Sequence, residues 1–85
     1  MAERRVVVAS AVGLHARPAA LFVTAVTKIG LPVTLTRRDG RTADARSILA
    51  VVTLDVKCGD EVLLCAHGDD AEAALDRLAE LLTHG

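Results

Sequence analysis

Aromatic side chains are almost absent from this sequence: Phe22 is the only one, and there is no Tyr and no Trp among 85 residues. Single-stranded nucleic acids are usually bound by stacking their bases on such rings, and their binders carry a strong positive charge. Here the formal net charge is −1. These features argue against nucleic-acid binding and predict a core built from Val, Leu, Ile and Ala.

Cysteines and long apolar runs are scarce as well. Cys58 and Cys65 form neither a C-x-x-C pair nor a zinc-binding pattern, and we expect Cys65 to be a small buried apolar residue in a reducing compartment. No apolar stretch approaches the roughly 20 residues of a membrane span, and the run after Arg4 and Arg5 breaks off before it resembles a signal peptide. We therefore expect a cytoplasmic protein with no membrane insertion, and the sequence offers no ligand set for a metal.

The remaining composition, 52% hydrophobic and 25% charged, is typical of one globular domain, here residues 1–85. Charge is uneven along it. Residues 1–46 carry eight basic and three acidic side chains, for +5, and residues 47–85 carry two basic and eight acidic ones, for −6. Such asymmetry can make the molecule dipolar and steer an acidic partner to one face, or it can be a coincidence of solvated charges.

Hydrophobic periodicity and turn signals predict the order β-α-β-β-α-β-α. The expected elements are a buried strand beginning at 6–8, a helix over 16–28, a strand over 33–36, the two-residue turn Asp39–Gly40, a strand over 41–44, a short helix over 47–54, a strand over 61–66 and a final amphipathic helix that Asp69 and Glu72 begin as a capping box. The simplest packing is an α+β open-faced β-sandwich of the α/β class: a four-stranded, mostly antiparallel sheet with three helices on one face and a polar, solvated opposite face.

The segment that carries chemistry surrounds His15, which follows a strand and a loop and directly precedes a helix with Pro18 in its first turn. A helix start leaves N–H groups unpaired and attracts anions. Pro18 has no N–H, so Ala16 and Arg17 are the expected phosphate-binding donors, and the Arg17 guanidinium suits phosphate oxygens. A partly neutral His there can accept a phosphoryl group. The alternative is a loop His beside an ordinary surface Arg.

The string from Gly13 to Ala20, Gly-Leu-His-Ala-Arg-Pro-Ala-Ala, resembles the active-site motif of the HPr family. These are the histidine-containing phosphocarriers of the bacterial phosphoenolpyruvate:sugar phosphotransferase system, and length, element order and the Ser47 segment extend the resemblance over the whole chain. It implies that enzyme I phosphorylates His15 on Nδ1, that Arg17 contacts the phosphoryl group, and that enzyme IIA domains receive it during sugar uptake. It also implies a monomeric carrier, not an enzyme, without metal or organic cofactor.

The short helix matches two further features of that family. Ser47 resembles its regulatory serine, which an HPr serine kinase/phosphorylase modifies in some bacterial lineages, although a helix N-cap alone explains a Ser there equally well. We expect Val51 and Leu54 to face the core. The apolar residues left over resemble the family's docking patch, which Arg17 and Arg46 border: Ala16, Ala20, Ile48, Leu49 and Val52. Ile48 can instead belong to the core.

One residue departs from the family pattern, because Asp55 stands where the family often has Gly. Asp tolerates a left-handed backbone better than most residues, but at some cost. His67 and His84 match no active-site position.

Two other function classes stay open. One is a regulatory HPr-like protein or a phosphocarrier of a nitrogen-related branch; family members that lost carrier activity lack the active His, which this chain has. The other is a small ligand-binding or interaction module without covalent chemistry.

Overall fold

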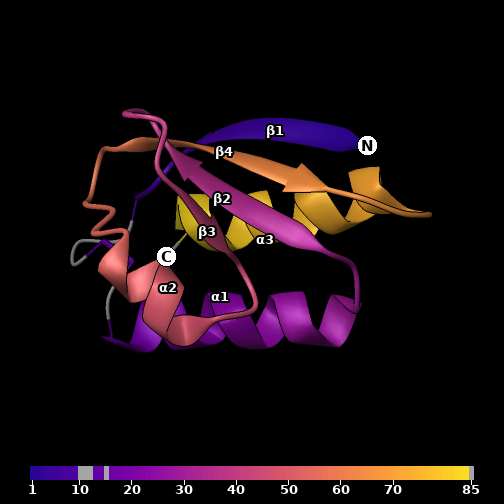
Figure 1. Ribbon diagram of the computed structural model, residues 1–85, viewed down its shortest axis with the longest axis horizontal. Helices are drawn as coiled ribbons and strands as arrows, with labels where there is room; N and C mark the ends of the chain where they lie inside the picture. The colour runs from indigo at the N-terminus through magenta and orange to yellow at the C-terminus, as the bar shows by residue number, and fades with distance from the viewer. Residues whose placement is uncertain (10–12, 15, 85) are drawn as a thin grey trace.

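Helices and strands follow one another in the predicted order in the computed structural model, which describes residues 1–9, 13–14 and 16–84 (Figure 1). The elements are β1 (Ala2–Val7), α1 (Ala16–Ile29), β2 (Val33–Arg37), β3 (Thr42–Asp44), α2 (Ile48–Thr53), β4 (Glu61–Ala66) and α3 (Ala71–His84). Within the described ranges, none of the helices combines the length and apolar character that a membrane crossing needs.

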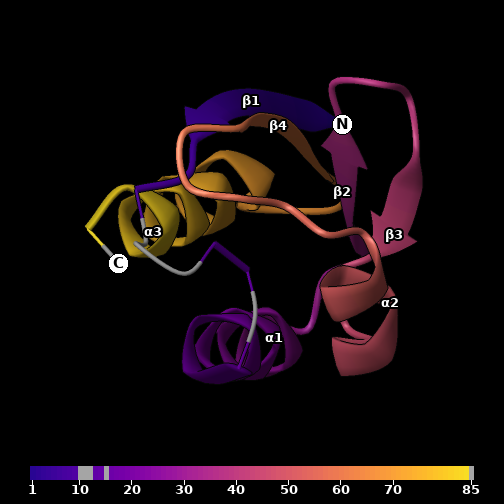
Figure 2. The same ribbon diagram turned by 90° about the vertical axis from the view of Figure 1, so that its left-hand side faces the viewer.

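The strands form one sheet in the order β1-β4-β2-β3, and every pairing between them is antiparallel. The register places Leu64 of β4 between Arg4 of β1 and Leu35 of β2. All three helices lie on the same side of this sheet, with α1 beneath α3 and beside α2 (Figure 2). The α+β open-faced sandwich predicted from the sequence is therefore confirmed.

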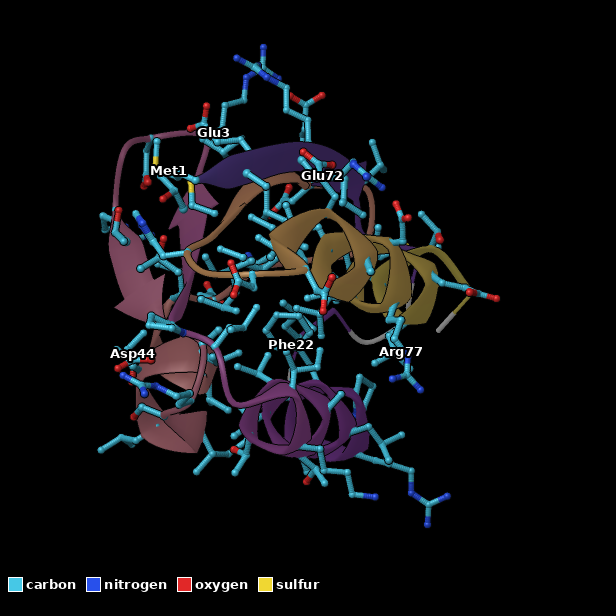
Figure 3. The ribbon with its side chains drawn as sticks, turned by 90° about the vertical axis from the view of Figure 1, so that its right-hand side faces the viewer. Met1, Glu3, Phe22, Asp44, Glu72 and Arg77 are labelled. Carbon is cyan, nitrogen blue, oxygen red and sulfur yellow. The ribbon has the colours of Figure 1, made fainter. Side chains whose placement is uncertain are left out.

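The core lies between the sheet and the helices. Strand residues alternate between this core and the open face, as the two-residue period of a strand requires. Phe22 points from α1 toward the sheet and is 1% exposed (Figure 3). The buried cluster to which it belongs is otherwise aliphatic and includes Val6, Leu35, Leu64, Leu75 and Leu78. The open face is largely polar, as predicted, and includes Glu3, Arg5, Thr34, Thr36 and Thr42.

Two strand predictions need correction. β1 begins at Ala2 rather than near Val6, and Val7 is exposed because it lies on the open face of the sheet rather than in a strand buried on both faces. The hairpin between β2 and β3 has three loop residues instead of two. Gly40 donates to the Arg37 carbonyl at 2.9 Å and has φ +94°, which closes a three-residue loop that ends in a left-handed Gly.

Three smaller predictions are also wrong. α3 begins at Ala71, because Asp70 has a φ of +62° and cannot be the first helical residue that a capping box on Asp69 requires. Leu81 of the predicted apolar stripe is exposed. Cys65 is only half-buried on the open face, where its thiol lies 3.4 Å from a Glu3 carboxylate oxygen. Burial, and then this contact, raise the pKa of the Cys65 thiol.

Part of the charge asymmetry along the chain is offset by ion pairs between its two halves. Arg4 pairs with Asp76 at 2.6 Å, and Arg5 pairs with Glu61 at 3.3 Å. Figure 3 shows Glu72, a further partner of Arg4, at the top of α3 beneath β1. Basic residues of the first half and acidic residues of the second half therefore meet in these ion pairs.

Candidate functional site

The backbone leading into α1 is fixed by the loop before β4. Leu14 is buried, and its N–H donates to the Val56 carbonyl at 2.9 Å. Gly13 has φ +71°, and a Cβ there would stand 2.3 Å from the Val56 oxygen and 2.8 Å from Lys57 Cα. Only Gly combines this left-handed backbone with so close an approach. His15 follows immediately and lies outside the described residues.

Arg17 lies in the first turn of α1, with Pro18 next to it. Its side chain is exposed, and it makes no ion pair or hydrogen bond with any residue that the structure describes. Ala16 is the first helical residue, so the backbone N–H groups of Ala16 and Arg17 belong to the turn that has no intrahelical partners. Two donors and an unengaged guanidinium therefore stand at the positive end of a 14-residue helix, an arrangement that can bind an anion.

A groove of about 810 Å³ runs between α1 and α3, and Arg17 lies at one end of it. Arg17, Leu21, Ala25 and Lys28 follow helical spacing, so they form one stripe along the groove with a cation at each end. Arg77 projects from α3 and lines the same groove from the opposite helix (Figure 3). The groove begins beside the anion-binding end of α1 and continues away from α2.

The predicted docking residues lie on α1 and α2, which pack side by side (Figure 2), apart from Arg46, which lies in the turn between β3 and α2. Ile48 and Leu49 are 45% and 75% exposed, which excludes the core position that the sequence left open for Ile48. Ala20 and Arg46 are exposed, and Val52 is half-buried against the core. Val51 and Leu54 are buried as predicted. The structure therefore exposes an aliphatic surface on the helix next to α1, although the side chain of Ala16 is outside what it describes.

Arg46 is held in place by its neighbour Asp44. The Asp44 carboxylate accepts the Arg46 backbone N–H at 2.9 Å and its Nε–H at 3.3 Å. The backbone hydrogen bond, followed by the side-chain one, holds the pKa of Asp44 below its ordinary value. Arg46 therefore has its guanidinium already engaged, unlike Arg17.

Ser47 is the N-cap of α2. It has an extended backbone, and its Oγ accepts the Ala50 N–H at 3.2 Å. The capping interpretation of Ser47 is therefore correct. It leaves the regulatory interpretation untouched, since a hydroxyl can cap a helix and also be a substrate.

Asp55 has φ +58°, so the residue that replaces the family's Gly does adopt the left-handed backbone. We expect Asp55→Gly to change the free energy of unfolding by less than about 1 kcal/mol, because two effects oppose each other. Gly relieves the backbone strain of the folded state, but it also makes the unfolded chain more flexible and so stabilises the unfolded state. Asp55→Val should lower it by roughly 1–2 kcal/mol, since a β-branched side chain is disfavoured there. Urea titration measures both, and a Val variant as stable as the parent would contradict the strain.

Sequence reasoning missed Arg37, a half-buried residue of β2. Its Nη1 donates to the carbonyl oxygens of Leu54 and Asp55 at 3.0 and 3.2 Å. No local signal marks this role, because an Arg at the end of a strand is usually solvated. Among the described residues, no group of three or more His, Cys, Asp or Glu side chains is placed to hold a metal ion.

The comparisons with known proteins agree with this geometry. The profile of the family described as "PTS HPr component phosphorylation site" matches residues 2–84. The chain is 52% identical over 85 residues to "Phosphocarrier protein HPr" of Streptomyces coelicolor, covering 100% of this chain and 91% of the relative. Among solved structures, a phosphocarrier protein HPr from Bacillus anthracis superposes with a TM-score of 0.90 at 36% identity, over 95% of each chain.

A third relative differs in assembly. The structure of the Bacillus subtilis catabolite-repression protein Crh has a TM-score of 0.77 at 39% identity, over 99% of this chain and 95% of that one, and that protein forms a domain-swapped dimer. Dimers therefore occur among the relatives, against the monomer that the resemblance implied. The family match over nearly all of the chain, the full-length identity and the shared fold together show that this protein belongs to the HPr family of phosphocarriers.

Proposed function

We propose that this protein is a phosphocarrier of the phosphotransferase system, which accepts a phosphoryl group on His15 from enzyme I and passes it to enzyme IIA domains during sugar uptake. Enzyme I takes the group from phosphoenolpyruvate. The observation that carries the proposal is the family's phosphorylation-site match, which spans His15, together with Arg17 and two backbone donors at the start of α1. A cytoplasmic location is part of the proposal.

The chemistry is an in-line transfer between two imidazoles. The Nδ1 lone pair of His15 attacks the phosphorus of the donor phosphohistidine. The donor's P–N bond breaks and the donor imidazole keeps that electron pair. The proton that the donor ring takes up is balanced by the proton that the His15 ring releases from its other nitrogen. The carrier contributes positioning and charge neutralisation, for which the Arg17 guanidinium and the N–H groups of Ala16 and Arg17 are suited. These groups need no metal or cofactor.

The test is incubation with enzyme I, magnesium and phosphoenolpyruvate labelled in its phosphoryl group. We expect a label that is stable in alkali and lost in acid, as a phosphoramidate is, and that passes to an enzyme IIA domain added later. Absence of label, or an acid-stable label, would refute the proposal. Label that forms but passes only to the IIA-type domain of a nitrogen-related branch would favour that alternative.

Ser47 is the proposed regulatory site, and its cap and charge can be tested separately. Ser47→Asp and Ser47→Asn both keep a good N-cap, so we expect the free energy of unfolding to change by less than about 0.5 kcal/mol in either. Only Asp adds negative charge beside Ile48 and Leu49. The rate of phosphorylation by enzyme I should therefore fall in the Asp variant and stay near the parental rate in the Asn variant; equal rates in the two would argue against control by charge.

A further inference from the structure

Arg37 is hydrogen-bonded to the first two residues of the loop from Leu54 to Asp60, which joins α2 to β4, and its guanidinium lies at ion-pair distance from the last residue, Asp60. Nη1 of Arg37 donates to the Leu54 and Asp55 carbonyls at 3.0 and 3.2 Å, and Nη2 lies 4.0 Å from Oδ2 of Asp60. The Arg37 side chain is only 24% exposed, so water shields these contacts less than it would at the surface. The two carbonyls lie where α2 ends and carry its partial negative charge, which suits a cation.

The Asp60 carboxylate also orders the middle of the loop. Oδ2 of Asp60 accepts the Lys57 N–H at 2.9 Å, and the Asp60 N–H donates to the Lys57 carbonyl at 3.0 Å. Asp55, beside these contacts, keeps its left-handed backbone while its carbonyl is bound by Arg37. A strained conformation persists only where its surroundings determine it, and Arg37 is part of those surroundings.

The middle of this loop is also the support for the chain that precedes His15. The Val56 carbonyl accepts the Leu14 N–H at 2.9 Å, and both side chains are fully buried. Gly13 lies so close to the backbone of Val56 and Lys57 that a side chain at position 13 would collide with it. Gly13 and Leu14 therefore have to follow any displacement of Val56.

We propose that Arg37 is a positioning residue for phosphoryl transfer: it fixes the loop 54–60, and through the Leu14–Val56 hydrogen bond it sets how the chain enters α1 at His15. The inference rests on the proposed phosphocarrier function. Arg37 acts at a distance, through contacts between backbone groups, and touches neither the phosphoryl group nor the partner.

In-line transfer is sensitive to such positioning, since a misplacement of about 1 Å can cost roughly 100-fold in rate. Partial relaxation of the loop in Arg37→Ala should therefore slow phosphorylation of His15 by about tenfold. Arg37→Lys keeps the charge, but one ammonium group cannot take over a planar fork that reaches two carbonyls and a carboxylate. We expect the Lys variant to fall between the parent and the Ala variant.

The experiment measures the initial rate of phosphorylation by enzyme I as a function of carrier concentration, at a temperature well below unfolding, together with hydrogen exchange of the Leu14 amide. The matched control is Arg38→Ala, which removes the same charge from the next residue, an exposed side chain with no ion pair to any described residue. We expect Arg37→Ala to lower kcat about tenfold with KM unchanged and to speed Leu14 exchange, and Arg38→Ala to change neither.

Three results would overturn the inference. The first is a kcat in Arg37→Ala equal to that of the parent. The second is a change in KM alone, which would place the effect in docking through α2. The third is a lower kcat with an unchanged exchange rate of the Leu14 amide. If the parent protein takes up no phosphoryl group, the proposed function fails. Leu14 exchange in Arg37→Ala and Arg38→Ala still decides whether Arg37 controls this backbone.

Discussion

Replacement of His15 by Ala is expected to abolish all phosphorylation of this protein by enzyme I and phosphoenolpyruvate. His15 is the only one of the three histidines that stands in the family's motif. The His67 N–H donates to the Pro32 carbonyl, so His67 lies near the chain that leaves α1. It is therefore separated from the start of α1 by the length of a 14-residue helix, about 20 Å at 1.5 Å per residue.

The measurement compares acid-labile label in the parent, His15→Ala and the control His67→Ala. We expect full labelling of the control and none of His15→Ala, a loss limited only by the detection threshold. Far-ultraviolet circular dichroism verifies that both variants are folded. Label that persists in His15→Ala and disappears in His67→Ala would show that His15 is not the phosphoryl acceptor. The proposed mechanism would then lose its basis.

Gly13→Ala is expected to cause the largest loss of stability among Gly→Ala substitutions at the glycines that the structure describes. The new Cβ would stand 2.3 Å from the Val56 carbonyl oxygen and 2.8 Å from Lys57 Cα, and both are backbone atoms that cannot rotate away. The φ of +71° adds strain of roughly 1–2 kcal/mol. Together these effects should lower the free energy of unfolding by about 3 kcal/mol or more and break the Leu14–Val56 hydrogen bond.

The matched control is Gly40→Ala, in the hairpin between β2 and β3. Gly40 also has a positive φ, +94°, but an added Cβ there would meet nothing within 4 Å. Gly40→Ala therefore measures the cost of a positive φ alone, without a collision of the new Cβ with other atoms. Urea denaturation of the two variants separates the terms: we expect Gly13→Ala to be the less stable by about 2 kcal/mol, a difference of roughly 10 °C in Tm for a chain of this size. Equal losses of stability in the two variants would show that the backbone of the loop 54–60 moves aside easily to accept the new Cβ. A loop that moves so easily would also weaken the positioning role assigned to Arg37.

Elements with strong local signals were predicted almost to the residue. β4 occupies Glu61–Ala66 as the apolar run indicated, and α2 has Ser47 and Leu54 as its flanking caps. The beginning of β1 escaped prediction because Ala2, Glu3 and Arg4 have no strong preference for a strand. They become extended by pairing with β4, about 60 residues away along the chain, which a local pattern cannot reveal.

The same reasoning separates the two parts of the candidate site. His15 and Arg17 stand in a short continuous motif, so the sequence alone was enough to propose them. The support behind them joins Leu14 to Val56 and Arg37 to Leu54, residues far apart in the chain. Asp55 lies between these two categories: its departure from the family pattern was visible in the sequence, but only the structure shows that its backbone is left-handed.

The burial of Phe22 in the core makes the protein simple to follow by nuclear magnetic resonance. Since Phe22 is the only Phe, Tyr or Trp in the chain, its ring is the single benzene ring whose current can shift the methyl protons of the core. Methyl signals displaced by that ring therefore report packing around one known point. They give an internal measure of core integrity in each of the variants proposed above, separate from any change at the proposed phosphorylation site.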